Sequence, residues 1–558
     1  MSYTPPTSEQ RFVLQHVVGI SELIEDIDLI DAVIEGAAAF AVGHYAALDR
    51  IGDTVGARWD DGAVTMPAGF REAYAAFVDG GWGGIGVPTE HGGQGLPYAL
   101  ATVLMEDLGS ANMGFSLINM LTPGAIEALI SHGSPDLQSF YLPKLVSGEW
   151  NGTMNLTEPQ AGSDVGALRT TATPAGDGSW RIKGSKVFIT FGEHDLTDNI
   201  VHLVLARTPG APAGPKGISL FLVPKFRPGE TGAPGVFNDV RCTGIEQKLG
   251  IHASPTCTLS FGDADDCHGW LIGEENEGMR CMFTMMNNAR LNVGLQGVEV
   301  AEAASQRASR YAQERVQFGK AIIEQPDVRR MVLRMRALTQ AARALVYFAA
   351  GCADRAHRGD TRAAARLDLL TPLAKAWGTD IGCEVASLGV QVHGGMGFVE
   401  EAGAAQHYRD IRIGPIYEGT NGIQAADLVN RKLDLNGGET LRGLLAEMRS
   451  ECAGETALAA LIEAVEATAN ELMAVSREDR LAGSYPFLTM LSVAVAGWLM
   501  LRQMNAAAKL DASDFASLKR ASARFFLDQV VPEALGLKAA ATAGAVLLTQ
   551  ISTRALAA

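Results

Sequence analysis

The chain has few of the features that mark metal-binding, disulfide-bonded or membrane proteins. Its seven cysteines form no CxxC pair, so we expect neither a metal site nor a disulfide framework, and reduced thiols favour a cytoplasmic protein. Residues 1–10 lack a basic segment followed by an apolar one, so no secretory signal is expected. The most apolar run, residues 487–501, is shorter than the roughly 20 residues of a membrane span. A buried helix is expected there, with peripheral membrane contact as the alternative.

Composition bounds the class of protein. The 558 residues predict two to four domains, and 47% hydrophobic with only 7% aromatic residues favours a helix-rich globular chain. Lysine and arginine total 46 against 63 aspartates and glutamates, a formal charge of -17, and no run of five like charges occurs. Because nucleic-acid binding needs clustered cations, this balance argues against a nucleic-acid partner.

The local composition and periodicity change along the chain and predict a mainly α protein with a middle β-domain. Helical spacing of apolar residues dominates except where short β-branched runs, such as residues 180–190 and 200–206, predict a small antiparallel sheet or barrel. Gly81-x-Gly83-x-x-Gly86 matches a dinucleotide fingerprint by letters only, since no strand precedes it. The predicted units are an N-terminal extension (1–34), a helical domain (35–150), a middle β-domain (151–275), a helical bundle (276–433) and, after a linker at 434–438, a C-terminal helical extension (440–558).

One loop, residues 416–424, carries a single carboxylate between glycines. Gly419 and Gly422 allow unusual backbone angles, and Pro415, Ile416 and Ile423 suggest that Glu418 lies against apolar surface. A desolvated glutamate has a raised pKa and is a better proton acceptor at neutral pH. A solvated Glu418 in an ordinary turn is the alternative that local sequence leaves open.

Five other segments are individually weak. The loop 157–164 has the polar composition of many surface turns, and Phe188 and Thr190 share one face of a predicted strand. Arg290 is a lone cation on an otherwise apolar helix, so it should meet a carboxylate, a carbonyl or an anionic ligand. Residues 314–319 and 391–397 each end a helix with glycine, as ordinary C-caps do, or bring donors to a phosphate-bearing cofactor.

Together, in this order, the segments resemble the acyl-CoA dehydrogenase family of flavoproteins. The matching pieces are LTEPQAGSD (156–164), GSKVFIT (184–190), NNAR (287–290), ERVQFGK (314–320), QVHGGMGF (391–398) and YEGTNGIQ (417–424). The resemblance covers residues 35 to 432. The early YTPPTSEQRFVL, residues 192–207 and the extra C-terminal unit resemble the extended subgroup that includes 3-methylmercaptopropionyl-CoA dehydrogenases.

The resemblance implies a fold of helical domain, β-barrel and helical bundle around FAD, and assigns roles residue by residue. Glu418 would be the catalytic base. Acyl-CoA would contact Ser163, Asn287, Arg290 and Gly419. FAD would contact Leu156, Thr157, Ser163, Phe188 and Thr190, and, across a subunit interface, Arg315, Gln317, Phe318, Gln391, Gly394, Gly395, Thr420 and Gly422. A cofactor site of this kind is not complete in one chain.

The implied reaction is α,β-dehydrogenation of an acyl-CoA thioester to a trans-2-enoyl-CoA. Glu418 would remove the α-proton while the β-hydrogen leaves as hydride to flavin N5, with the thioester carbonyl polarised as in an oxyanion hole. Some relatives carry the base immediately before the arginine, but here that position is Ala289. Glu418 is therefore the only candidate that the resemblance offers.

Four residues depart from the family pattern. Phe188 stands where tryptophan is common, Met154 where an aromatic is frequent, Gly422 where glutamine is frequent and Asn287 where aspartate is frequent. The first two keep an apolar wall, whereas the last two change individual hydrogen bonds.

Substrate and partners follow only as expectations. The subgroup points to 3-methylthiopropanoyl-CoA or another short-chain acyl-CoA, with an electron-transfer flavoprotein as acceptor and a homodimer as the expected assembly, a tetramer being the alternative. An acyl-CoA oxidase and a non-enzymatic AidB-like flavoprotein are the alternative functions. The acyl chain, the acceptor and the role of the C-terminal extension stay open at this point.

Overall fold

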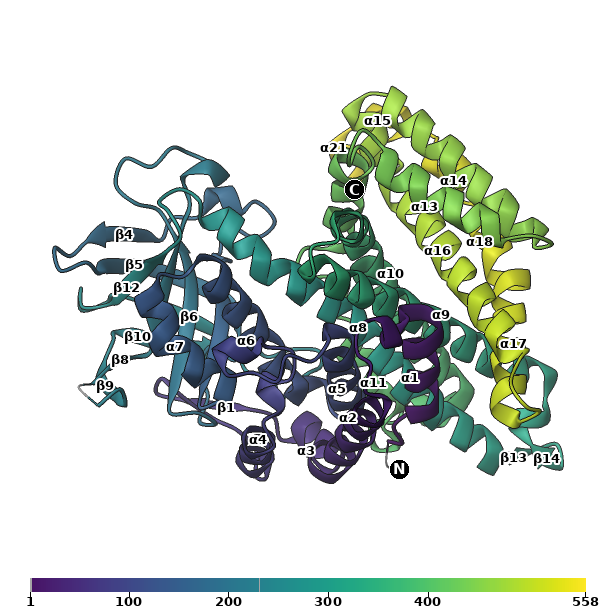
Figure 1. Ribbon diagram of the computed structural model, residues 1–558, viewed down its shortest axis with the longest axis horizontal. Coiled ribbons are helices and arrows are strands. Elements are labelled where there is room, and N and C mark those ends of the chain that lie inside the picture. Colours follow the sequence, from purple (N-terminus) through teal and green to yellow (C-terminus); the bar gives the residue numbers. More distant parts are fainter. Residues whose placement is uncertain (1–2, 230) are drawn as a thin grey trace.

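The computed structural model describes residues 3–229 and 231–558, with one β-rich part beside several helical parts (Figure 1). Residues 1–2 of the predicted N-terminal extension and residue 230 of the predicted middle domain lie outside the described residues. The predicted fold class, mainly helical with a middle β-domain and a C-terminal helical extension, is confirmed.

The first part of the chain is helical. Its helices are α1 (Thr7–Val13), α2 (Ile27–Phe40), α3 (Asp49–Thr54), α4 (Phe70–Asp79), α5 (Tyr98–Ala111), α6 (Met113–His132) and α7 (Pro135–Ser147), with a small hairpin of β1 (Arg58–Asp60) and β2 (Ala63–Thr65). Asp26 caps α2 through the N–H of Leu29, so the predicted domain boundary at residue 34 falls inside a helix. Residues 82–84 form a short 3₁₀ turn, which confirms that the glycine-rich segment is no dinucleotide turn.

The β-rich part forms one eight-stranded sheet with strand order β10-β11-β5-β12-β7-β6-β3, in which β4 also pairs with β5. The strands are β3 (Trp150–Asn155), β4 (Thr171–Pro174), β5 (Trp180–Thr190), β6 (Asn199–Ala206), β7 (Ser219–Pro224), β10 (Val240–Ile245), β11 (Thr256–Phe261) and β12 (His268–Ile272), beside a separate pair of β8 (Phe226–Pro228) and β9 (Pro234–Phe237). The prediction of an antiparallel sheet is wrong at one edge, where β3 and β6 run parallel. Parallel neighbours need a long crossover, which local sequence patterns do not reveal.

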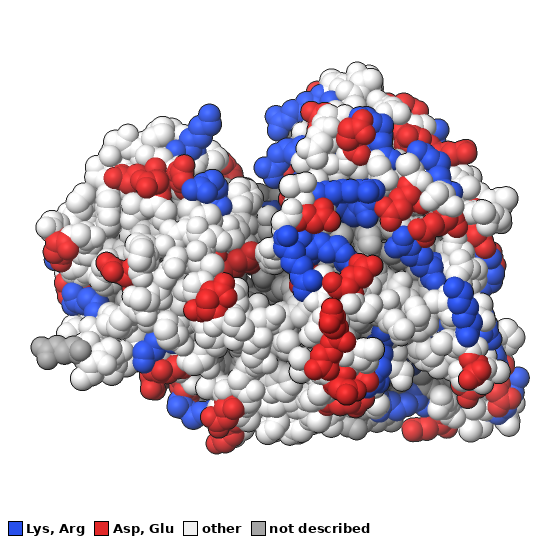
Figure 2. Space-filling view, in the orientation of Figure 1, with Lys and Arg blue, Asp and Glu red and all other residues white. Residues whose placement is uncertain are grey.

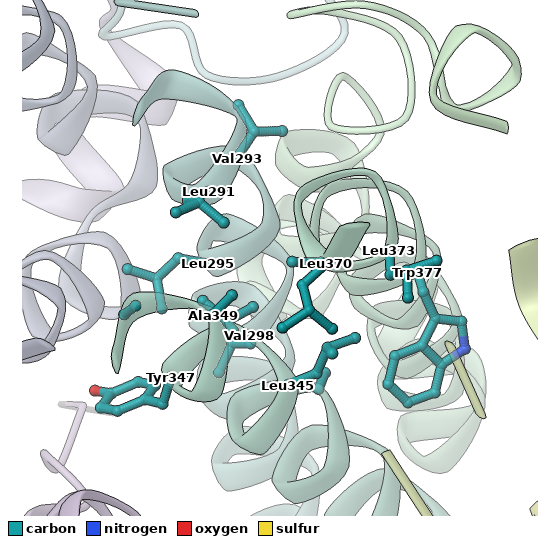
Figure 3. Packing of buried hydrophobic residues seen from close by; sticks show 14 of the residues in the cluster. Leu291, Val293, Leu295, Val298, Leu345, Tyr347, Ala349, Leu370, Leu373 and Trp377 are labelled. Atoms are coloured by element: carbon teal, nitrogen blue, oxygen red, sulfur yellow. The ribbon is translucent and has the colours of Figure 1, made fainter. Parts of the chain in front are cut away.

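The bundle that follows is built on three long helices, α8 (Gly278–Glu314), α9 (Pro326–His357) and α10 (Thr361–His393), with the shorter α11 (Ala404–Ile411) and α12 (Asn421–Asp427). Side chains of the long helices interdigitate in a core that includes Val298, Leu345 and Leu370 (Figure 3). Glycines bring α8 and α10 close together, because a Cβ at Gly297 would lie 1.9 Å from the Gly378 carbonyl oxygen. A hairpin of β13 (Val316–Gln317) and β14 (Lys320–Ala321) follows α8.

The last part is a second helical unit packed on the bundle. It contains α13 (Glu439–Glu451), α14 (Thr456–Ala474), α15 (Arg477–Ala482), α16 (Ser484–Ala507), α17 (Asp514–Phe525), α18 (Val531–Leu535), α19 (Lys538–Ala541), α20 (Val546–Gln550) and α21 (Thr553–Leu556). By length and composition α6 and α16 are apolar enough to cross a membrane, yet 83% of each apolar window is buried inside the fold. The predicted buried helix over residues 487–501 is therefore confirmed.

Two contacts tie this unit to the rest of the chain. Trp498 of α16 packs edge-on against Phe348 of α9, with ring centroids 5.5 Å apart. Lys519 of α17 donates to Glu9 of α1 at 2.7 Å, and both side chains are buried. Helix α1 near the start of the chain and α17 of the C-terminal unit thus meet beside the bundle.

Candidate functional site

The loop before α12 holds Glu418 in an unusual backbone conformation. Glu418 has φ +53° and Gly419 φ +83°, and the Thr420 hydroxyl then caps α12 by accepting from the Ile423 N–H at 3.1 Å. A left-handed φ is uncommon for a non-glycine residue and recurs at functional sites. The predicted tight loop is confirmed, but Gly422 lies inside α12 and is not needed for the turn.

Glu418 is partly exposed as a residue, and its carboxyl group makes no hydrogen bond to any residue that the structure describes. Burial raises its pKa to about 7, against the opposing charges of Arg290 and Lys375. The expected apolar wall is not provided by Ile416 and Ile423, whose side chains are 49% and 40% exposed. Desolvation comes instead from packing of the loop on α8 and α10, where the neighbouring Tyr417 hydroxyl donates to Gln296.

Two buried cations face this carboxyl from different helices. Arg290 of α8 donates to the Asn287 side chain at 3.4 Å, while its Nε finds no partner among the described residues. Lys375 of α10 is fully buried and donates to the side-chain Oδ1 of Asn421 at 2.9 Å, and burial lowers the pKa of Lys375 to about 7. Within residues 3–229 and 231–558, neither cation forms an ion pair with Glu418 within 4 Å.

Sequence reasoning missed Lys375 and Asn421. Lys375 is the one charged residue of the apolar stretch 369–377, and the rule that drew attention to Arg290 applies to it equally. Asn421 donates to the Asp380 carboxylate at 2.9 Å and to the Ala376 carbonyl oxygen at 3.0 Å, so a residue of the catalytic loop is bound firmly to α10.

The β-rich part brings four of the predicted flavin contacts together. The Val187 N–H donates to the Thr157 carbonyl oxygen at 2.9 Å, which places Leu156 and Thr157 beside the end of β5 that carries Phe188 and Thr190. The register of β5 against β11 shifts at this point, and Phe188 has φ +62° and is 61% exposed. A β-bulge of this kind re-aims a side chain, here an aromatic ring toward solvent.

A second glutamate, Glu158, lies buried behind these contacts. It accepts hydrogen bonds from Lys186 Nζ at 2.8 Å, from the Thr170 hydroxyl at 2.6 Å and amide at 3.1 Å, from the Arg169 amide at 2.7 Å and from the Gln160 side chain at 2.7 Å. Burial alone would raise the pKa of Glu158, but Lys186 and these donors lower it to about 2. The pair fastens the loop 156–170 to β5, while Ser163 in that loop is exposed.

Two groups of the remaining predicted cofactor residues lie far from Glu418 in the same chain, whereas Thr420 and Gly422 follow it by two and four residues. Helix α8 ends at Glu314, so the predicted glycine C-cap at 319 is wrong. Phe318 and Gly319, with φ +53° and +78°, instead form the turn of the β13–β14 hairpin. Arg315 follows Arg290 by 25 residues of nearly continuous helix, about 37 Å. Arg315 and Gln317 are exposed with Phe318, which is 93% exposed.

The end of α10 lies near that hairpin end of the bundle. His393 stacks on Tyr311 of α8 at a centroid distance of 4.4 Å, and Gln391, Gly394 and Gly395 are exposed. Gln391 follows Lys375 by 16 helical residues, about 24 Å. Within one chain, the hairpin and the end of α10 are therefore separated from Arg290 and Lys375 by about 24–37 Å of helix.

A cavity of about 700 Å³ lies between α5, α6 and α8, lined by residues such as Met105, Ile118, Ile126 and Asn288. Glu418 is not among its lining residues. On the surface, Figure 2 shows a hollow between the β-rich part and the C-terminal helices, with charges of both signs interspersed over the helical side. In the part of the chain that the structure describes, no group of three or more metal-ligating side chains occurs.

These features fit a planar, anionic ligand between the β-rich part and the bundle. The exposed Phe188 ring offers an apolar face, and the buried Arg290 Nε is a donor without an acceptor. A buried unpaired donor is costly, and a ligand oxygen would satisfy it.

Comparison with known proteins follows the same division of the chain. Family models match in four consecutive stretches: acyl-CoA dehydrogenase N-terminal domain (47–149), middle domain (153–264) and C-terminal domain (276–433), and acetyl-CoA dehydrogenase C-terminal like (444–552).

Individual relatives match nearly end to end. The chain is 46% identical over 572 residues to 3-methylmercaptopropionyl-CoA dehydrogenase of Ruegeria pomeroyi, covering 96% of this chain and 97% of that one. It is 37% identical over 518 residues to butyryl-CoA dehydrogenase of Syntrophomonas wolfei, covering 86% and 85%. A solved acyl-CoA dehydrogenase complexed with FAD from Bacillus anthracis has a TM-score of 0.77 over 96% of this chain and 91% of that one; at 22% identity it shows the fold alone.

Proposed function

The chain belongs to the acyl-CoA dehydrogenase family, and on that premise we propose how its own residues carry out the α,β-dehydrogenation of an acyl-CoA thioester. It is an oxidoreductase of the family, with relatives that include 3-methylmercaptopropionyl-CoA and butyryl-CoA dehydrogenases. The observation that carries the proposal is Glu418, whose carboxyl group makes no hydrogen bond to the described residues and whose pKa burial raises to about 7.

Glu418 removes the α-proton of the thioester. A carboxylate with a pKa near 7 is half deprotonated at neutral pH and is a stronger base than a solvated glutamate. The loop leaves the backbone amides at 418 and 419 free to polarise the thioester carbonyl, since neither donates a hydrogen bond to the described residues. Arg290 and Lys375 stabilise the negative charge that develops beside them.

FAD fits the residues described above for β5 and the Glu418 loop and, when bound, would supply the hydride acceptor. Leu156, Thr157, Phe188 and Thr190 would hold it beside Glu418. Ser163, Asn287, Arg290 and Gly419 would contact acyl-CoA. Residues of a second subunit would complete the cofactor site, from Arg315, Gln317, Phe318, Gln391, Gly394, Gly395, Thr420 and Gly422.

The separation of these groups within one chain supports an oligomer, and we propose a homodimer. We further propose an electron-transfer flavoprotein as acceptor and a cytoplasmic location, which the seven free cysteines support. The substrate proposed is a short acyl-CoA such as 3-methylthiopropanoyl-CoA, supported by the 46% identity to the Ruegeria pomeroyi enzyme.

The test is anaerobic mixing of the FAD-loaded enzyme with a panel of acyl-CoA thioesters from short to long chain. Bleaching of the flavin absorbance by short thioesters is expected. Reoxidation is then compared between air and an electron-transfer flavoprotein. Rapid reaction with air would make the protein an oxidase, and absence of bleaching by any thioester would refute the proposed reaction.

A further inference from the structure

We infer that the C-terminal helical extension positions the catalytic base, through a hydrogen-bond chain that runs from Tyr485 to the loop of Glu418. The inference rests on the proposed function of Glu418. It assigns Tyr485, Asp380 and Asn421 as positioning residues, none of which touches the reacting atoms.

The chain of contacts is continuous. The Tyr485 hydroxyl of α16 donates to Asp380 Oδ2 of α10 at 2.6 Å. Asp380 Oδ1 accepts from the Asn421 amide at 2.9 Å, and Asn421 Oδ1 accepts from Lys375 Nζ at 2.9 Å. Asn421 is three residues from Glu418 in the loop and is 3% exposed, so its side chain has one well-defined position.

Each link has a reason to stay in place. Asn421 also donates to Thr379 Oγ1 at 3.0 Å, and its N–H donates to the Pro415 carbonyl oxygen at 2.9 Å, so both ends of the turn are anchored. Hydrogen bonds to a charged group, such as that of Tyr485 with Asp380, are stronger than neutral ones. Helices α12 and α16 are in direct contact, so the extension packs on the catalytic helix itself.

The hydrogen-bonded residues also couple electrostatically to Glu418. Glu418 is faced by Arg290 from α8 and Lys375 from α10, with Tyr417 beside it, and Lys375 is faced in turn by Asp380 and Arg290. The Tyr485 hydroxyl favours the charged form of Asp380. Loss of that hydroxyl makes Asp380 less negative, Lys375 less positive and the pKa of Glu418 higher.

The test compares FAD-loaded wild-type enzyme with Tyr485→Phe and with Tyr408→Phe, an exposed tyrosine of α11 whose hydroxyl has no partner in the described part of the chain. Hydrogen–deuterium exchange of the peptide 416–424 reports the order of the loop directly. For Tyr485→Phe we expect faster exchange there, and flavin reduction at saturating acyl-CoA slower by about three- to tenfold with substrate affinity unchanged. The midpoint of the pH profile should move to higher pH, and Tyr408→Phe should match wild type.

Asp380→Asn provides a second test, because it keeps the shape of the link and removes its charge. It should move the pH midpoint in the same direction as Tyr485→Phe. Wild-type exchange and an unshifted pH profile in both variants would overturn the inference. If no acyl-CoA reduces the wild-type enzyme, the proposed reaction fails, but unchanged exchange in Tyr485→Phe would still independently refute the positioning role.

Discussion

The protein contains two glutamate–lysine sites, each with a buried lysine, that behave in opposite ways. Glu158 is joined to Lys186 at 2.8 Å, accepts four further hydrogen bonds, and has its pKa lowered to about 2. Glu418 faces Lys375 without a direct bond and has its pKa raised to about 7. Similar residue types therefore give a permanent ion pair at one site and a group ready to accept a proton at the other.

The difference lies in what satisfies the carboxylate. Burial penalises charge at both sites, and only enough donors can offset that penalty. At Glu158 backbone amides and a hydroxyl converge on the oxygens, whereas at Glu418 the lysine is turned toward Asn421. A base must keep its lone pairs free for substrate, so the missing hydrogen bonds are a condition of the proposed chemistry.

The largest effect is expected when the base itself is replaced. Glu418→Gln keeps the size of the side chain and removes the proton acceptor, so flavin reduction by acyl-CoA should slow by about 10²–10⁴-fold. Stopped-flow absorbance after anaerobic mixing measures this, and bound FAD should be retained. Glu401→Gln, an exposed glutamate, is the control. Bleaching of Glu418→Gln at the wild-type rate would contradict the assignment.

Breaking the ion pair between Glu158 and Lys186 should lower the free energy of unfolding. Lys186→Met leaves Glu158 buried without its cation, and such a loss destabilises by about 3–5 kcal/mol. A clear fall in the melting temperature of the FAD-loaded enzyme is expected. Lys183→Met on the same strand removes an exposed pair with Asp265 and should melt like wild type. Equal melting temperatures of the two variants would show that the Glu158–Lys186 pair does not stabilise the fold.

Removing Lys375, which faces Glu418, should change the pH dependence of flavin reduction. Without Lys375 the pKa of Glu418 rises further, so in Lys375→Met the rate, which increases as the carboxyl loses its proton, should reach half its maximum above pH 7. A rise of one pH unit lowers the rate at pH 7 by roughly fivefold. Reduction rates from pH 5.5 to 9 measure the shift, with the exposed Lys216→Met as control. A midpoint at lower pH would reverse the assigned sign.

The smallest effect is expected when a single hydrogen-bond donor to Glu158 is removed. Thr170→Val removes the 2.6 Å hydroxyl bond to Glu158 but leaves its backbone amide in place. A loss of about 1 kcal/mol is expected, well below that of Lys186→Met. Thermal melting of the two variants side by side gives the ratio. A loss as large as that of Lys186→Met would mean that the hydroxyl, not the cation, dominates.

The sequence predicted the helices and most strands because their periodicity is local. It also singled out the loop of Glu418 and the lone Arg290. It could not predict the parallel pairing of β3 with β6, or the bulge that exposes Phe188, because both depend on a neighbouring strand. Resemblance supplied the roles of residues that no local pattern distinguishes.

The site around Glu418 was predicted only in part for the same reason. Lys375 and Asn421 are 46 residues apart, and Asp380 and Tyr485 are 105 apart. No spacing rule connects such positions before the bundle is folded. Apolar Ile416 and Ile423 suggested burial of the loop, yet the pKa of Glu418 depends on α8 and α10.

The contact of Glu9 with Lys519 has a consequence for synthesis. The two residues are 510 positions apart, and a ribosome adding about 5–20 residues per second needs roughly 25–100 s to cover that distance. During this time Glu9 lacks the nearer of its two cations, since Arg343 lies 3.8 Å from it in the folded protein and Lys519 lies 2.7 Å from it. The contact between α1 and α17 is thus among the last that the growing chain can form, and a chain halted before α17 leaves Glu9 without its lysine.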